Sequence, residues 1–169
     1  MNRTLIVIDM QNDFIDGALG TSEAVAIVPN VVKKLSEYKN DRIIFTRDTH
    51  GDDYMNTQEG HYLPVPHCIK GTNGWEIRKE LNADQTASEI IDKDRFGYNG
   101  WNKYTAEELG DIELIGLCTD ICVVSNAIIL KALFPENKIS VDAACCAGVT
   151  PEAHDAALAT MKSCQIEVR

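Results

Sequence analysis

Residues 113–133 read ELIGLCTDICVVSNAIILKAL, and this stretch predicts a strand, a tight turn and a buried helix in immediate succession. The run Glu113–Leu117 is apolar and has the length of a strand. The segment Cys122–Leu133 has apolar residues on most sides of a helix, which is typical of a helix buried in the core. A strand followed directly by a helix is the repeating unit of a parallel sheet.

The same alternation continues on both sides of this unit. Further strands are predicted at Thr4–Ile8, Arg42–Thr46, Glu89–Ile91, Lys138–Val141 and Gln165–Val168. Helices are predicted at Val25–Tyr38, with Pro29 at its true start, at Lys103–Leu109, and at Pro151–Lys162, with Thr150 as cap. We therefore expect an α/β fold of three layers, a six-stranded, mostly parallel sheet with helices on both faces.

Length and composition narrow the class of protein. A chain of 169 residues with 44 % hydrophobic residues fits one domain spanning 1–169. The 26 acidic residues against 16 basic ones give a formal net charge of −10, which disfavours nucleic acid or an anionic membrane as partner. No apolar run approaches the roughly 20 residues of a membrane span, and the N-terminal run is too short for a secretion signal. We expect a cytoplasmic protein whose six cysteines are mostly small buried hydrophobes.

Chemically active side chains follow several of the predicted strands. Asp9 follows the first strand, Asp48 and His50 the second, Lys93 the third, and Cys122 comes just after the fourth. Because ligands bind at the carboxyl ends of parallel strands, these residues are expected to meet at one edge of the sheet. A helix N-terminus and the charge of Lys93 would favour the thiolate of Cys122, and Asp9 would carry the proton. Taken singly, Asp9 would be an ordinary turn residue and Lys93 a solvated lysine.

The long irregular stretch that begins at Asp48 carries three of the four histidines of the chain. Its candidate metal ligands are Asp48, His50, Glu59, His61 and His67. Mixed carboxylate and imidazole ligands suit Zn, Mn or Fe, although histidines in loops are often only solvated. The fourth histidine, His154, is expected at the surface of the last helix.

Five motifs occur in order along the chain: IDMQNDF (8–14), TRDTH (46–50), PHCIKGTNG (66–74), DKDRF (92–96) and IGLCTDICV (115–123). Together they resemble the isochorismatase-like cysteine hydrolases, and within them the nicotinamidase/pyrazinamidase branch. The resemblance runs from about Leu5 to Pro151. It implies the isochorismatase-like hydrolase fold for the sheet described above.

The resemblance assigns roles to individual positions. Asp9, Lys93 and Cys122 match the catalytic triad of the family. Metal ligands of the branch fall on Asp48, His50 and His67. Glu59 stands at a position that supplies the remaining ligand in some members, Asn56 stands where others have a histidine, and His61 competes with Glu59.

The same resemblance outlines a substrate pocket. Phe14 and Phe96 are the implied substrate-binding aromatics. The backbone N–H groups of Cys118 and Cys122 would form an oxyanion hole, helped by a cis peptide bond between Leu117 and Cys118.

These features predict a cysteine amidohydrolase that converts nicotinamide and water to nicotinic acid and ammonia through a thioester on Cys122. One divalent ion, Zn, Mn or Fe, would anchor the pyridine nitrogen. The alternatives are a related cysteine hydrolase of another small amide or carbamoyl substrate, a phospho-accepting receiver-like domain built on Asp9, Asp48 and Lys93, and a catalytically idle homologue. The expected partners are a small-molecule amide and other copies of the same chain, with neither nucleic acid nor membrane.

Overall fold

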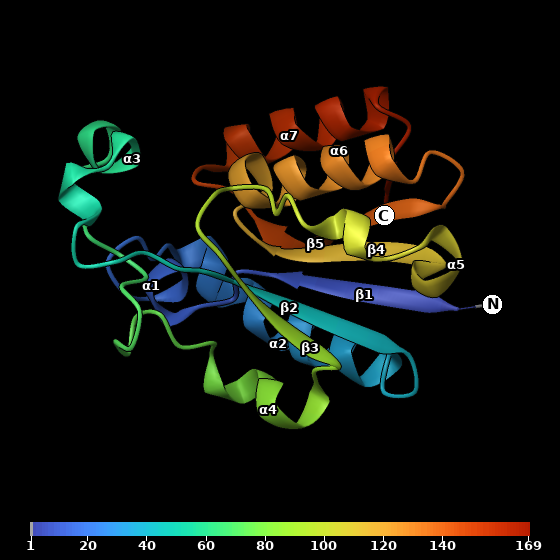
Figure 1. The fold of residues 1–169 in the computed structure, drawn as a ribbon, viewed down its shortest axis with the longest axis horizontal. Coiled ribbons are helices and arrows are strands. Elements are labelled where there is room, and N and C mark those ends of the chain that lie inside the picture. Colours follow the sequence, from blue (N-terminus) through green and yellow to red (C-terminus); the bar gives the residue numbers. More distant parts are fainter. Residues whose placement is uncertain (1) are drawn as a thin grey trace.

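The computed structural model describes residues 2–169 and has a six-stranded sheet at its centre (Figure 1). The strand order is β3-β2-β1-β4-β5-β6, and every neighbouring pair runs parallel. The expected α/β fold is confirmed, with a sheet that is parallel throughout. The strands are β1 (Arg3–Ile8), β2 (Arg42–Asp48), β3 (Glu89–Lys93), β4 (Asp111–Leu117), β5 (Ile139–Ala147) and β6 (Glu167–Val168).

Helices cover both faces of the sheet, α2 on one side and α6 with α7 on the other (Figure 1). The helices are α1 (Asn12–Ile15), α2 (Ser22–Glu37), α3 (Gln58–Tyr62), α4 (Ala83–Thr86), α5 (Ala106–Leu109), α6 (Val124–Leu133) and α7 (Pro151–Ser163). Short 3₁₀ turns lie at Tyr54–Asn56, Lys79–Leu81 and Trp101–Lys103, and a π-helical turn at Thr119–Val123.

Strand β1 shows why both faces are covered. Leu5 and Val7 point into the core beneath α2, whereas Ile6 and Ile8 point into the core beneath α6 and α7. All four side chains are fully buried, and each such burial contributes roughly 1.5–3 kcal/mol. A strand that is apolar on both faces therefore needs a layer of helices on each side.

The strand order reverses between β1 and β4, and ligands of open α/β sheets bind outside the carboxyl ends at such a point. The two strands approach closely there: a Cβ on Gly116 would lie 2.1 Å from the carbonyl oxygen of Ile8. Gly116 also has a φ of +117°, a conformation that side chains rarely adopt. Asp9 and Cys118, the first residues after these two strands, are thereby brought to the switch point.

The predicted helix Val25–Tyr38 was expected to begin at Pro29, and this boundary was wrong. Helix α2 begins at Ser22, because the side chain of Thr21 caps it by accepting a hydrogen bond of 3.0 Å from the amide of Ala24. Pro29 lies inside the helix, exposed on its outer side. Burial of Ala24 and Ile27 against the sheet outweighs the hydrogen bond that the proline removes.

Other boundaries also differ from the predictions. The predicted helix Lys103–Leu109 is two pieces, a 3₁₀ turn ending at Lys103 and α5, which Thr105 opens with a capping box. The predicted helix Cys122–Leu133 is the end of a π-helical turn followed by α6. Strand β5 extends to Ala147, six residues past the predicted Val141, since its second half lacks the β-branched residues that mark a strand.

None of the helices in residues 2–169 combines the length and the apolar character needed to cross a bilayer.

Candidate active site

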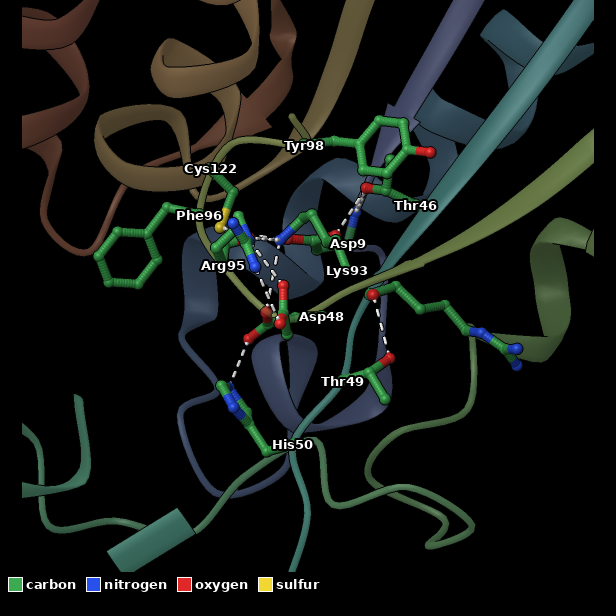
Figure 2. Close-up of polar contacts among 12 residues, drawn as sticks. Asp9, Thr46, Asp48, Thr49, His50, Lys93, Arg95, Phe96, Tyr98 and Cys122 are labelled. Atoms are coloured by element: carbon green, nitrogen blue, oxygen red, sulfur yellow. Dashed lines mark hydrogen bonds and ion pairs between the residues drawn. The ribbon is translucent and has the colours of Figure 1, made fainter. Parts of the chain in front are cut away.

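Three side chains from three strand ends meet at the switch point. The ammonium nitrogen Nζ of Lys93, the last residue of β3, lies 2.7 Å from Oδ2 of Asp9 and donates a 3.6 Å hydrogen bond to Sγ of Cys122 (Figure 2). The side chains of Asp9 and Lys93 are 0 % exposed, and Cys122 is buried as well. The structure thus brings together the carboxylate, the amine and the thiol that the strand ends were expected to deliver.

Neighbouring groups fix the carboxylate and the amine in place. The hydroxyl of Thr46 donates a 2.6 Å hydrogen bond to Oδ1 of Asp9. Nζ of Lys93 also donates to the carbonyl oxygen of Arg95 at 3.0 Å and lies 3.4 Å from Oδ1 of Asp48. No hydroxyl or amide group of the described residues donates to Oδ2 of Asp9, so this oxygen is available to accept another proton.

Burial governs the protonation of these groups. It raises the pKa of the Cys122 thiol well above its usual range; the charge of Asp9 acts in the same direction, and Lys93 offsets only part of the effect. Burial also raises the pKa of Asp9, against the lowering effects of Lys93 and Thr46. For Lys93, burial would lower the pKa, but the charges of Asp9, Cys122 and Asp48 outweigh it and raise it. Burial thus raises the pKa of the Cys122 thiol and works against the expected thiolate, while the charge of Lys93 works for it.

A second group of side chains lies beside the first and could hold a metal ion. Asp48, His50, Glu59 and His67 each offer one ligand atom, and these four atoms all lie within 4.8 Å of one another. Nε2 of His50 lies 3.0 Å from Oδ2 of Asp48 and 3.7 Å from Oε1 of Glu59. Nε2 of His67 lies 3.7 Å from that Asp48 oxygen and 3.6 Å from that Glu59 oxygen.

These spacings fit a divalent metal. Ligand atoms at about 2.1 Å from a tetrahedral centre lie roughly 3.4 Å from one another. Burial would raise the pKa of Asp48, but the hydrogen bond with His50, the contact with His67 and the charge of Lys93 outweigh it and lower this pKa, so Asp48 is a carboxylate. Nδ1 of His67 lies 2.8 Å from the carbonyl oxygen of Val65, which directs Nε2 toward the group. His61, the competing residue, is exposed and lies outside this group.

The sequence did not point to several residues that position these groups. Gln11 is fully buried, donates to the carbonyl oxygen of Asp48 at 2.8 Å and accepts from its amide at 2.7 Å. Asp13 accepts a 2.8 Å hydrogen bond from the amide of Cys68, next to His67. Thr46, described above, is the third. The only sequence signal for them was their place within or beside the strand-end motifs.

A cavity of about 680 Å³ opens over both groups. Its lining includes Cys122, Asp48, Glu59 and His67 together with the two expected aromatics, Phe14 and Phe96. Phe14 is buried, and its ring centre lies 5.5 Å from that of His67. The ring of Phe96 is 46 % exposed and points away from the Lys93 cluster (Figure 2).

The turn that carries Cys122 has the expected backbone. The peptide bond between Leu117 and Cys118 is cis, and Cys118 and Cys122 both line the cavity. Nδ1 of His154 in α7 lies 2.8 Å from the hydroxyl of Thr119, within the same turn. His154 is thus half-buried and tied to the turn, where a surface residue was expected.

A three-layer α/β fold with a cysteine, a lysine and an aspartate at its switch point is the arrangement expected of a cysteine hydrolase. The comparison with known families assigns the chain more narrowly. Residues 3–169 match the sequence model of the Isochorismatase domain, and the chain belongs to this family. This assignment leaves the receiver-like alternative without support.

Similar proteins extend the comparison. The crystal structure of nicotinamidase/pyrazinamidase PncA from Bacillus subtilis superposes with a TM-score of 0.86 at 28 % identity, covering 99 % of both chains. Pyrazinamidase of Pyrococcus horikoshii in complex with zinc gives a TM-score of 0.84 at 27 % identity, over 100 % of this chain and 99 % of that one. A probable inactive nicotinamidase of Arabidopsis thaliana is 30 % identical, over 96 % of this chain and 89 % of its own.

Proposed function

We propose that this protein is a metal-dependent nicotinamidase, which hydrolyses nicotinamide to nicotinic acid and ammonia. The observation that carries the proposal is the contact of Lys93 with both Asp9 and Cys122, beside a cavity lined by Cys122 and by three of the four side chains that could hold a metal ion. The nicotinamidase and pyrazinamidase activities named for similar proteins support this substrate class.

Formation of the thioester involves two proton transfers, both through Asp9. Sγ of Cys122 attacks the carboxamide carbon while its proton passes to Oδ2 of Asp9, the oxygen that faces Lys93 and is not bound by Thr46. The N–H groups of Cys118 and Cys122 bind the resulting oxyanion, an interaction worth roughly 3–4 kcal/mol for each donor. Asp9 then returns the proton to the departing ammonia, and a thioester remains on Cys122.

Water completes the cycle. Asp9, again a carboxylate, takes a proton from a water molecule that attacks the thioester carbon. The carbon–sulfur bond breaks, the thiol recovers the proton from Asp9, and nicotinic acid leaves. Lys93 stays charged throughout and holds the Asp9 carboxylate and the sulfur at the same point.

The residues for the metal are Asp48, His50, Glu59 and His67, and we propose that they hold one divalent ion, Zn, Mn or Fe. The zinc complex of the Pyrococcus horikoshii relative supports zinc among these. When bound, the ion would supply a Lewis acid for the ring nitrogen of the substrate. Phe14, beside His67, would pack on the ring, and Phe96 would cover it at the cavity mouth.

Two further expectations belong to this proposal. All six cysteines are free thiols, which suits a protein that works in a reducing compartment such as the cytoplasm. Exposed apolar side chains on α2 and α6, among them Val25, Val32 and Leu133, suit a homo-oligomer.

The test is ammonia release from nicotinamide by the zinc-loaded protein. We expect turnover by the wild type, none by Cys122→Ala, and unchanged turnover by Cys164→Ala, a half-buried cysteine just after α7. Hydroxylamine added during turnover traps the thioester as a hydroxamate. A wild type that binds zinc and releases no ammonia would overturn the proposal and place the chain with its probably inactive Arabidopsis relative.

A further inference from the structure

The cavity beside Cys122 is larger than one pyridine carboxamide requires. Its volume of about 680 Å³ lies within the range of roughly 300–1,000 Å³ that is typical of pockets for drug-sized ligands. Part of the lining belongs neither to the metal-ligand group nor to the Asp9–Lys93–Cys122 cluster. This part includes Leu19, Ala24 and Val149, which we call the aliphatic wall.

We propose that the preferred substrate is a pyridine carboxamide with an apolar substituent on its ring, seated against the aliphatic wall. This inference rests on the proposed nicotinamidase activity and narrows its substrate class. The three side chains of the wall carry no hydrogen-bonding atom. The hydroxyl of Thr21, which also lines the cavity, already accepts a hydrogen bond from the amide of Ala24, so a polar substituent finds few partners there. An alkyl group gains about fourfold in binding for each methylene group that it buries.

The aliphatic wall is tied to the rest of the site by hydrogen bonds. Val149, between β5 and α7, donates its amide at 3.0 Å to Oδ1 of Asp120, which lies in the same turn as Cys122. Leu19 donates its amide at 2.8 Å to the carbonyl oxygen of Asp13. Ala24, in the first turn of α2, is 2 % exposed. A substituent would therefore meet a preformed surface and cause little reordering.

The rest of the lining is more mixed, since Gln58, Asp94 and Arg95 bring polar side chains to it beside the apolar Leu63 and Ile121. Asp9 and Lys93 have 0 % exposed side chains, so the position where the leaving amine takes its proton is closed to anything much larger than ammonia. Asp48, Glu59 and His67 present carboxylates and an imidazole, which disfavour an apolar group. The substituent therefore belongs on the ring and not on the amide nitrogen.

Steady-state kinetics with four carboxamides test the inference. The substrates are nicotinamide, 5-propylnicotinamide, 6-propylnicotinamide and N-propylnicotinamide. We expect kcat/KM for at least one ring-propyl compound to exceed that for nicotinamide by about tenfold or more, since three methylene-sized groups are buried. We expect no hydrolysis of the N-propyl compound.

A variant tests whether the gain in kcat/KM for a ring-propyl compound comes from the aliphatic wall. Val149 is 52 % exposed, so Val149→Trp can fill this part of the cavity without repacking the core. In this variant the ratio of kcat/KM for the preferred ring-propyl compound to kcat/KM for nicotinamide should fall to about one. The control is Glu136→Trp, an exposed residue after α6 that does not line the cavity, and it should leave the ratio unchanged. Calorimetric binding of the same compounds to Cys122→Ala gives a readout that needs no turnover.

The outcomes separate the two proposals. Hydrolysis of nicotinamide with no gain for either ring-propyl compound overturns the substituent inference and leaves the nicotinamidase proposal intact. The same holds if Val149→Trp lowers all activities equally. Absence of hydrolysis of every carboxamide overturns the nicotinamidase proposal itself.

Discussion

Thr46 donates a 2.6 Å hydrogen bond to Oδ1 of Asp9, and so a residue of β2, the strand next to β1, helps to orient the Asp9 carboxylate. Both residues are 0 % exposed. The bond occupies one oxygen of Asp9 and leaves the other, Oδ2, facing Lys93. Thr46 is therefore a positioning residue for the proposed proton transfer.

Replacing Thr46 by valine should move the pH profile. Burial raises the pKa of Asp9, and the Thr46 hydroxyl opposes that rise. Because the carboxylate form accepts the proton, activity falls as the pH drops through this pKa. Removing the hydroxyl raises the pKa further, so the acid limb of kcat/KM for nicotinamide should shift to higher pH, with a loss of about tenfold in kcat.

Thr46→Ser is the matched control, since it keeps the hydroxyl, and it should leave the acid limb where the wild type has it. An unchanged profile in Thr46→Val would mean that a group other than Asp9 limits the rate at low pH.

Lys93→Met should destabilise the protein strongly. The substitution leaves the buried carboxylates of Asp9 and Asp48 without the cation that lies 2.7 Å and 3.4 Å from them. Breaking a buried ion pair by removing one partner costs about 3–5 kcal/mol, so urea unfolding at neutral pH should show a loss of that size. Turnover should vanish as well.

Two further variants keep that measurement interpretable. Lys70→Met removes a lysine that is 66 % exposed beside Asp92, and it should change stability by less than about 0.5 kcal/mol. The double variant Asp9→Asn with Lys93→Met removes the excess charge and should be more stable than Lys93→Met alone. A double variant no more stable than the single one would show that lost packing, not the unpaired charge, causes the effect.

Metal content should depend on Glu59 and His67 and not on His61. His67→Ala and Glu59→Gln each remove one of four converging ligand atoms and should lower zinc affinity by tenfold or more. His61→Ala, an exposed residue in the same loop, should bind zinc like the wild type. Elemental analysis after dialysis against a weak chelator makes the comparison without any assay of activity. Loss of zinc in His61→Ala would reverse the assignment of the fourth ligand.

The site could be predicted from the sequence because ligands bind at the carboxyl ends of parallel strands. Asp9 and Lys93 were expected together because parallel strands of β-branched residues end just before them or at them, and the sheet places them as expected. Thr46 and Gln11 were not found, because a threonine in a strand and a glutamine after one are common and carry no spacing signal. Their role appears only when the strand register is known.

The pKa of the Cys122 thiol could not be predicted from the sequence. A cysteine near a helix start and a lysine suggested a thiolate, yet the pKa of the Cys122 thiol is raised because the chain buries it. Depth of burial depends on how α6 and the surrounding loops pack, which a local pattern does not record. The sequence therefore placed Cys122 at the site but did not record the burial that raises its pKa.

Pro29 provides a last test, because the sequence suggested a helix start at a position that lies inside α2. Pro29→Ala restores the amide that can donate to the carbonyl oxygen of Val25, and this gain exceeds the lower entropy that proline gives the unfolded chain. We expect a stabilisation of roughly 1–2 kcal/mol in urea unfolding. The matched control is Pro151→Ala at the first position of α7, where the missing amide has no partner in the helix and no gain is expected. A neutral or destabilised Pro29→Ala variant would show that the missing hydrogen bond costs no more than the proline gains by restricting the unfolded chain.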